Sequence, residues 1–161
     1  MATKNSTPKI EHYLLKHKSK DLFIDNDYDV TSKSPFITNS ENAHSLHASV
    51  LKTENLYDLF GDKKYKPNSF EVKLVELNIM QPHSTSKAGH YLLKHKTKDL
   101  FIQSEDEMDL HVAEHPHIAT IADANYIHSN ILKWGKIGDL HAKKYFDAAD
   151  FEIKLVELVI K

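Results

Sequence analysis

Residues 12–24 read HYLLKHKSKDLFI, and residues 90–102 read HYLLKHKTKDLFI. The two stretches are identical at twelve of thirteen positions and differ only where Ser19 corresponds to Thr97. A second block, FEVKLVEL at 70–77, returns as FEIKLVEL at 151–158 with a single change. Because self-similarity at a nearly constant offset marks repeated structural units, the sequence predicts one small module present in two tandem copies.

The middle of the module also matches between the copies. The offset is 78 residues at the first block and 81 residues at the second. At the offset of 81 the matching pairs are Leu46 and Ile127, His47 and His128, Val50 and Ile131, and Leu51 and Leu132. The segments at 25–42 and 103–123 diverge, and a common framework with one divergent segment is typical of a scaffold with specialised loops.

Each copy is expected to hold a β-hairpin, a loop, a helix and a closing central strand, which makes the fold class α+β. The first block predicts two strands joined by a Lys-Ser/Thr-Lys-Asp turn. The apolar residues that fit one helical face are Ala43, Leu46, Val50 and Leu51, and the second copy repeats this face with Ala124, Ile127, Ile131 and Leu132. Asn39 or Ser40 is available as the N-cap, and a short second helical turn is expected at 56–60. The closing block is apolar on both faces and predicts a central strand, with a helix as the alternative for so short a run.

The expected organisation has four parts. Residues 1–11 form a flexible N-terminal tail, 12–79 the first repeat module, 80–89 a linker and 90–161 the second repeat module. The linker rests on Pro82, Ser84, Ser86 and Gly89, which are typical of a loop. The two modules are expected to pack against each other or to pair as one extended sheet.

The composition restricts the class of protein. The chain has 161 residues, of which 40% are hydrophobic and 27% charged, as in an ordinary globular protein. No apolar run is long enough for a membrane helix, and the polar N-terminus lacks a signal peptide's apolar segment. We therefore expect a cytoplasmic protein, with export by a route that needs no N-terminal signal left open. The absence of cysteine excludes disulfides and thiolate metal sites.

The charged residues argue against nucleic acid as the partner. The chain contains no arginine, and its 21 lysines against 23 acidic residues give a net charge of −2. Arginine is the side chain best suited to phosphate and guanine, and a net negative chain is not attracted to a polyanion.

No motif for catalysis or for a cofactor is present. A Gly-x-Ser-x-Gly nucleophile motif is missing, and four glycines do not make a phosphate-binding loop. The sequence therefore favours a protein that is not an enzyme and predicts no cofactor.

Histidine is unusually frequent, with twelve residues. His12, His17 and His47 recur as His90, His95 and His128. They are either titratable ligands near neutral pH or half-buried framework residues that both copies share, and the repetition favours the framework.

The densest histidine cluster lies in the second copy alone. His111, His115 and His117 stand close in sequence, with Glu114 beside them. His111 and His115 would share one face of a helix, a spacing known from zinc sites, and a zinc or nickel site is one hypothesis. Pro116 interrupts any such helix, so a solvated polar loop is the other.

Aromatic residues also distinguish the second copy. Trp134 stands where the first copy has Thr53, and Tyr126, Tyr145 and Phe146 lie near it in sequence. Such residues are favoured anchors of protein interfaces. Alternatively, Trp134 covers the end of the helix against the core.

Part of the second copy resembles a known family. The run HYLLKHK at 90–96, followed by Glu114-His115-Pro116 and Leu132-Lys133-Trp134, is similar to the N-terminal α/β segment of HipA-type toxin kinases. In that segment a Leu-Met-His-Lys strand and a Glu-His-Leu-Pro loop precede a helix that ends in tryptophans. The family's second tryptophan, its following arginine and the kinase body are missing here, so no catalytic residue carries over. The resemblance implies a stand-alone binding or inhibitory module.

These observations lead to one principal hypothesis and two alternatives. The principal hypothesis is a non-catalytic protein that binds another protein through two linked modules, since linked sites raise avidity. Its lysine-rich, cysteine-free composition suits an accessory or inhibitory protein of a phage, mobile element or pathogen. Self-association is a further kind of partnership to be considered. The alternatives are a small-ligand or metal-binding protein that uses the histidines of the second module, and an enzyme with one degenerate copy.

Overall fold

The computed structural model describes residues 10–58, 60–81, 89–104, 109–141 and 143–161. Most of the predicted tail at 1–11 and of the predicted linker at 80–89 lies outside these residues. The first half contains β1 (His12–His17), β2 (Phe23–Ile24), β3 (Val30–Thr31), α1 (Ser40–Leu51), β4 (Leu56–Tyr57), β5 (Lys64–Tyr65), the 3-10 turn η1 (Pro67–Ser69) and β6 (Phe70–Ile79). The second half contains β7 (His90–His95), β8 (Phe101–Ser104), β9 (Leu110–Ala113), α2 (Ile121–Trp134), β10 (Lys136–Gly138), β11 (Tyr145–Asp147), η2 (Ala148–Asp150) and β12 (Phe151–Ile160).

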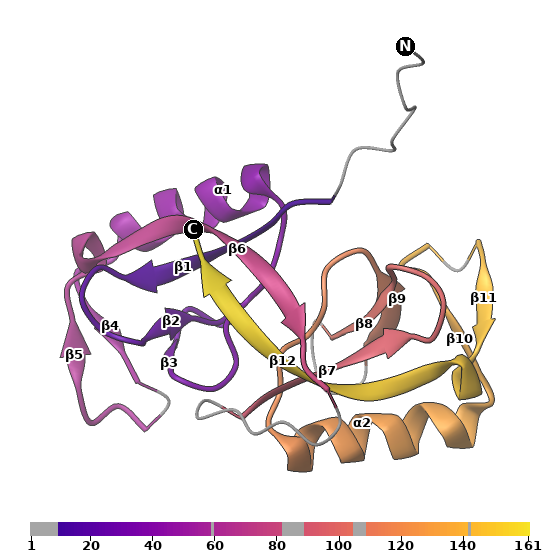
Figure 1. The fold of residues 1–161 in the computed structure, drawn as a ribbon. Coiled ribbons are helices and arrows are strands. Elements are labelled where there is room, and N and C mark those ends of the chain that lie inside the picture. Colours follow the sequence, from indigo (N-terminus) through magenta and orange to yellow (C-terminus); the bar gives the residue numbers. More distant parts are fainter. Residues whose placement is uncertain (1–9, 59, 82–88, 105–108, 142) are drawn as a thin grey trace.

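One large antiparallel sheet joins the two halves. In the described residues it has eight strands in the order β3-β2-β1-β6-β12-β7-β8-β9, so β6 and β12 lie at its centre (Figure 1). These two strands pair with each other, with Leu77 opposite Leu158. The predicted closing strands are confirmed, and the helical alternative is wrong. The chain is thus a mixed α/β protein with a large antiparallel sheet and two helices.

The closing strand is apolar on both faces because its first half packs into one hydrophobic core and its second half packs into another, on the opposite face. Side chains alternate between the faces of a strand. Phe70 and Val72 pack beneath α1, whereas Val75 and Leu77 belong to a different cluster on the opposite face. The change from one core to the other falls at Leu74-Val75, which explains the adjacent apolar residues.

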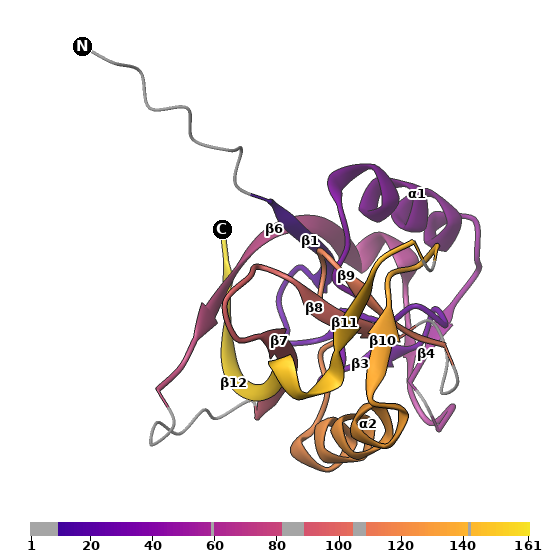
Figure 2. The same ribbon diagram turned by 90° about the vertical axis from the view of Figure 1, so that its right-hand side faces the viewer.

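The two helices lie on opposite sides of the molecule, as Figures 1 and 2 show. α1 buries Ala43 and Val50 against β1, β2 and β6, and α2 buries Ala124, Ile127 and Ile131 against the corresponding strands of the second half. Neither described helix is long and apolar enough to cross a membrane.

The helix ends follow from local sequence. Of the two predicted candidates, Asn39 caps α1, because its side chain accepts a hydrogen bond from the Asn42 amide at 2.7 Å. Thr120 does the same for α2 through the Asp123 amide at 3.2 Å. Gly135 ends α2 with a φ of 78°, a conformation that side chains resist.

Backbone pairing closes the centre of the sheet into a ring. Tyr13 exchanges two hydrogen bonds with Thr38 (2.8 and 2.9 Å), and Tyr91 exchanges two with Ala119 (2.9 Å each). Segments 36–38 and 117–119 meet at a bridge between Phe36 and His117. We call the resulting closed path the central ring. It runs through β1, β6, β12, β7, residues 117–119 and residues 36–38, and so contains segments from both halves.

A shared core lies within the central ring. Its buried members occupy corresponding positions of the two halves, namely Leu14 and Leu92, Phe23 and Phe101, Ile37 and Ile118, and Val75 and Val156. We call this cluster the ring core. Both expected relations between the halves, packing against each other and pairing as one sheet, are therefore present.

Three local predictions need correction. Leu56–Tyr57 is strand β4, paired with β5, and not a helical turn. The segments expected to be loops contain the short edge strands β3 and β9. Leu51 and Leu132, expected on the buried helix face, are exposed, because each follows a core residue by one position and so points about 100° away from it.

Candidate functional site

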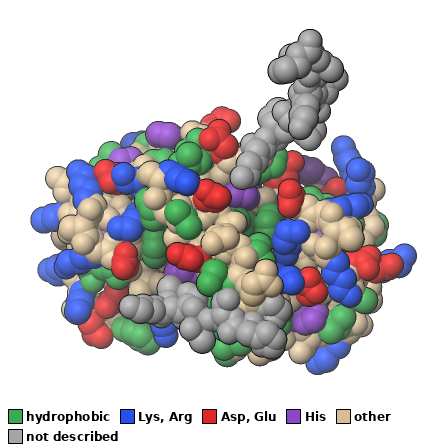
Figure 3. All heavy atoms as spheres, viewed as in Figure 1, with side chains coloured by type: hydrophobic (Ala, Val, Ile, Leu, Met, Phe, Trp, Pro, Cys, Tyr) green, Lys and Arg blue, Asp and Glu red, His purple; other side chains and the backbone are tan. Residues whose placement is uncertain are grey.

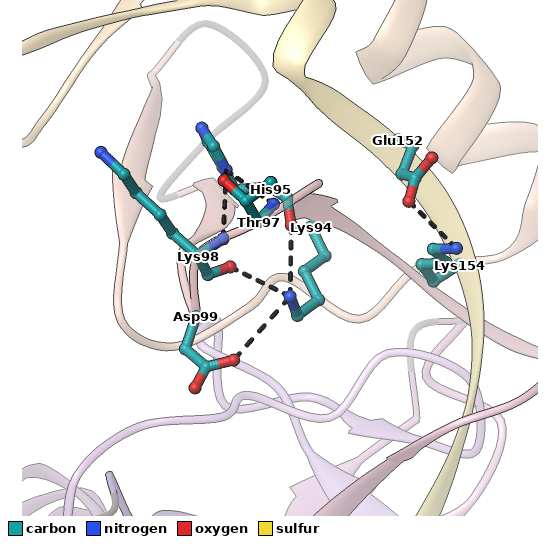
Figure 4. A network of polar contacts seen from close by, with 7 residues as sticks. All are labelled: Lys94, His95, Thr97, Lys98, Asp99, Glu152 and Lys154. Carbon is teal, nitrogen blue, oxygen red and sulfur yellow. Dashed lines mark hydrogen bonds and ion pairs between the residues drawn. The ribbon is translucent and has the colours of Figure 1, made fainter.

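The repeated lysine and histidine of the HYLLKHK motif hold the turn that follows them (Figure 4). The Lys94 ammonium donates to the carbonyl oxygens of His95 (3.2 Å) and Lys98 (3.0 Å) and lies 3.8 Å from the Asp99 carboxylate. The His95 Nδ1 accepts from the Thr97 and Lys98 amides at 3.1 and 3.2 Å. These polar groups are thereby satisfied within the hairpin.

The first half makes the same contacts. The Lys16 ammonium donates to the His17 and Lys20 carbonyl oxygens at 3.1 and 2.9 Å, and His17 Nδ1 accepts from the Ser19 amide at 3.1 Å. Burial, with the nearby Lys20 and Lys16, lowers the pKa of His17. In both halves the motif therefore builds a turn, which favours the framework interpretation of these histidines.

The histidines of the two helices have a similar structural contact. His47 Nε2 donates to the Phe70 carbonyl oxygen at 3.0 Å, and His128 Nε2 donates to that of Phe151 at 3.2 Å. Each bond ties a helix to the start of a closing strand.

His12 and His90 each contact a residue of the other half of the chain. His12 Nδ1 lies 2.9 Å from His115 Nδ1, so one ring donates and the other accepts. His12 also packs edge-on against Phe101, with ring centroids 6.0 Å apart. His90 Nε2 donates to the Ser32 carbonyl oxygen at 3.2 Å, and burial lowers the pKa of His90.

The three histidines of the proposed metal cluster have separate environments. His111 is buried in β9, and its Nδ1 has no hydrogen-bond partner among the described residues. His115 bonds to His12, whereas His117 lies in the backbone bridge to Phe36. Burial lowers the pKa of both His115 and His117.

These positions do not build a metal centre. Over the part of the chain that the structure describes, no group of three or more His, Asp or Glu side chains could hold a metal ion. Pro116 is buried, and residues 114–120 contain bends and isolated bridges but no helix, so the helical spacing of His111 and His115 does not arise. The metal hypothesis stays a prediction without support in this geometry.

The predicted interaction residues separate into exposed and packed members. Tyr126, Trp134 and Tyr145 are 64%, 51% and 62% exposed on α2 and β11. Phe146 is half-buried, and its ring lies 6.2 Å from His95 and 6.4 Å from Phe151. Phe146 therefore belongs to the core of the second half.

The exposed aromatic residues have polar counterparts in the first half. At the offset of 81 residues, Ser45, Thr53 and Lys64 correspond to Tyr126, Trp134 and Tyr145. We call these three aromatic residues the aromatic set. Ser45 lies on α1 and Lys64 on β5, as Tyr126 lies on α2 and Tyr145 on β11. Thr53, in contrast, follows the end of α1, whereas Trp134 is the last residue of α2.

A cavity of about 260 Å³ lies beside the start of β1. Its apolar lining is Ile10, Leu74, Val75, Leu77, Ile79 and Phe101, and its polar lining is Glu11, His12, Glu76, Lys94, Asp99, Glu114 and Lys161. We call this space the β1–β6 cavity. Sequence reasoning missed it, because its lining comes from both ends of the chain and meets only when the central ring closes.

Comparison with known proteins adds no further assignment. The chain matches no protein-family model, no curated protein and no solved structure. Its function must therefore be inferred from its own surfaces and cavities.

Proposed function

We propose that the chain is a non-catalytic, cytoplasmic protein-binding protein, built from two tandem copies of one module, and that the second copy carries the recognition surface. The observation that supports this most directly is the aromatic set. Three large aromatic side chains are exposed on one half, at positions where the other half has Ser, Thr and Lys.

A partner that covered these exposed aromatic residues would gain binding free energy from their burial. Fully burying a large apolar side chain is worth about 1.5–3 kcal/mol. Tryptophan and tyrosine dominate the binding energy of protein interfaces because they combine a large apolar area with a polar tip. The aromatic set therefore supports a protein surface as the partner.

The charge distribution favours a protein over a nucleic acid. Basic and acidic side chains lie interspersed over the face in Figure 3, with hydrophobic side chains between them. The whole chain has a net charge of −2 and no arginine, so electrostatic attraction to a polyanion is weak.

The tandem arrangement supports a division of tasks between the modules. Each half supplies half of the ring core. The first module therefore stabilises the second, even if the first module binds no partner. The resemblance to the N-terminal segment of HipA-type kinases also supports a binding or inhibitory role, since that segment carries no catalytic residue over to this chain.

The test replaces the aromatic set by the residues of the first half. The variant Tyr126→Ser, Trp134→Thr, Tyr145→Lys should keep the wild-type circular dichroism spectrum, because all three replaced side chains are more than half exposed. Truncation of one hot-spot residue costs about 2 kcal/mol or more. We expect the triple variant to lose at least about a hundredfold in affinity for the protein captured by the wild-type chain.

The matched control removes an exposed aromatic residue from the other half. Phe60 is 82% exposed, and its counterpart in the second half is His141, so Phe60→His is the reciprocal exchange. It should leave the affinity unchanged. A triple variant that is folded and binds as tightly as wild type, or a wild-type chain that captures no protein, would contradict the proposal.

A further inference from the structure

The β1–β6 cavity lies against the ring core. Val75 and Phe101, both members of the ring core, form part of its wall. Leu77 and Ile79 continue the wall along β6 and are only partly buried. Apolar side chains left accessible in a concave site are typical of a place where an apolar group of a ligand binds.

The charges around this wall do not balance. The lining contains four carboxylates, on Glu11, Glu76, Asp99 and Glu114, and two ammonium groups. The Lys161 ammonium lies 2.9 Å from the Glu76 carboxylate, and that of Lys94 lies 3.8 Å from Asp99. Neither Glu11 nor Glu114 forms an ion pair with a described residue.

The histidine pair brings together the two backbone segments that carry these carboxylates. Glu11 directly precedes His12, and Glu114 directly precedes His115. The 2.9 Å contact between the two histidine rings therefore joins the two segments at the cavity. At least one of the rings must be neutral for one nitrogen to accept. The pair therefore carries at most one positive charge and cannot neutralise both carboxylates.

A metal ion does not fit this arrangement. In the described parts of the chain no three His, Asp or Glu side chains come together closely enough to ligate one. An excess of negative charge beside an apolar wall instead suits a larger cation, one that covers apolar surface and places its charge at the rim. An anion of the same size would be repelled.

We propose that the β1–β6 cavity is a binding site for a small organic cation with an apolar body, of the arylalkylamine class. The apolar body lies against Val75, Leu77 and Phe101, and the ammonium group lies between Glu11 and Glu114. The site is separate from the aromatic set.

Three probes that share a phenyl ring and a two-carbon chain test the charge requirement. They are phenethylamine, phenethyl alcohol and 3-phenylpropionate, which are cationic, neutral and anionic at pH 7.5. Each is titrated into the ¹⁵N-labelled full chain, and amide chemical shifts are followed. Phenethylamine should give saturable shifts at residues that line the cavity. The alcohol should bind roughly tenfold more weakly, and the propionate should not saturate.

Variants then assign the two carboxylates. Glu11→Gln and Glu114→Gln should each weaken phenethylamine binding by about two- to fivefold, as expected for partly exposed charges. Glu157→Gln is the matched control, because Glu157 is exposed on β12 and does not line the cavity. The triple variant of the aromatic set should bind phenethylamine as wild type does.

Several results would overturn the proposal. Equal affinity for all three probes would mean that charge plays no part. Shifts confined to α2 and β11 would place the amine on the aromatic set instead. Loss of binding in Glu157→Gln equal to that in Glu114→Gln would reduce the effect to overall charge, and no saturable shift with phenethylamine would remove the site.

Discussion

Leu14→Ala and Leu92→Ala should destabilise the whole chain, and by nearly the same amount. Both side chains are 0% exposed in the ring core, at corresponding positions of β1 and β7. Each substitution removes three buried carbons at about 0.8 kcal/mol each, or about 2.4 kcal/mol. The cavity left behind raises the loss to about 3–4 kcal/mol.

The ring core contains residues from both halves, so a substitution that destabilises one half must also lower the stability of the other. Urea unfolding can be followed by far-UV circular dichroism, which reports the whole chain, and by the fluorescence of Trp134. Trp134 is the single tryptophan of the chain and lies in the second half. With a slope near 2 kcal/mol per molar urea, either variant should lower both midpoints by about 1.5–2 M.

Leu14→Ala is the decisive variant, because it lies in the half without tryptophan. If it leaves the Trp134 transition at the wild-type midpoint while the circular dichroism signal shifts, the halves unfold separately and the shared core is refuted. Leu51→Ala is the control, since Leu51 is 48% exposed. It should change stability by no more than about 0.5 kcal/mol.

Two further predictions concern pH and a helix end. Burial lowers the pKa of His90, His115 and His117, so below pH 6.5 the unfolded chain binds more protons than the folded one. The stability that these groups contribute is therefore complete above about pH 6.5 and falls as the pH decreases, which urea midpoints at pH 7.5, 6.5 and 5.5 can measure. Gly135→Ala places a side chain at a φ of 78° and should cost about 1–2 kcal/mol, or roughly 2–8 °C in Tm by calorimetry.

Each of these predictions has its own contrary outcome. His117→Asn should reduce the acid sensitivity, and a variant as sensitive as wild type would show that His117 is not among the responsible groups. Asp25 and Asp29, whose pKa burial raises, act in the opposite direction. An unchanged Tm for Gly135→Ala would mean that α2 can end in another conformation.

The sequence predicted the elements that carry long or repeated patterns. The closing strands, the hairpins and the helix N-cap at Asn39 could be predicted because each has a local physical signature. The edge strands β3 and β9 and the hairpins β4-β5 and β10-β11 could not, because these strands are only two to four residues long, show no period and lie outside the two repeated blocks. Leu56–Tyr57, part of the run expected to form a helical turn, is a strand because it pairs with β5.

The candidate site was predictable only in part. Trp134, Tyr126 and Tyr145 are exposed, and their role as interaction residues stays a prediction. Phe146 is packed because alternation along β11 turns it towards Phe151. The contact between His12 and His115 joins residues 103 positions apart. No local pattern predicts such a contact, and His12 also lines the β1–β6 cavity.

The pairing of β6 with β12 has a consequence for molecules that meet one another. Residues 70–77 and 151–158 differ at a single position, and Leu77 pairs with Leu158 at equivalent places in the two strands. A chain whose β12 has come loose therefore exposes on β6 an edge that the β12 of a neighbouring molecule matches in sequence and register. Exchange of closing strands between two chains would then rebuild the same ladders, so this fold is suited to domain-swapped dimers at high concentration.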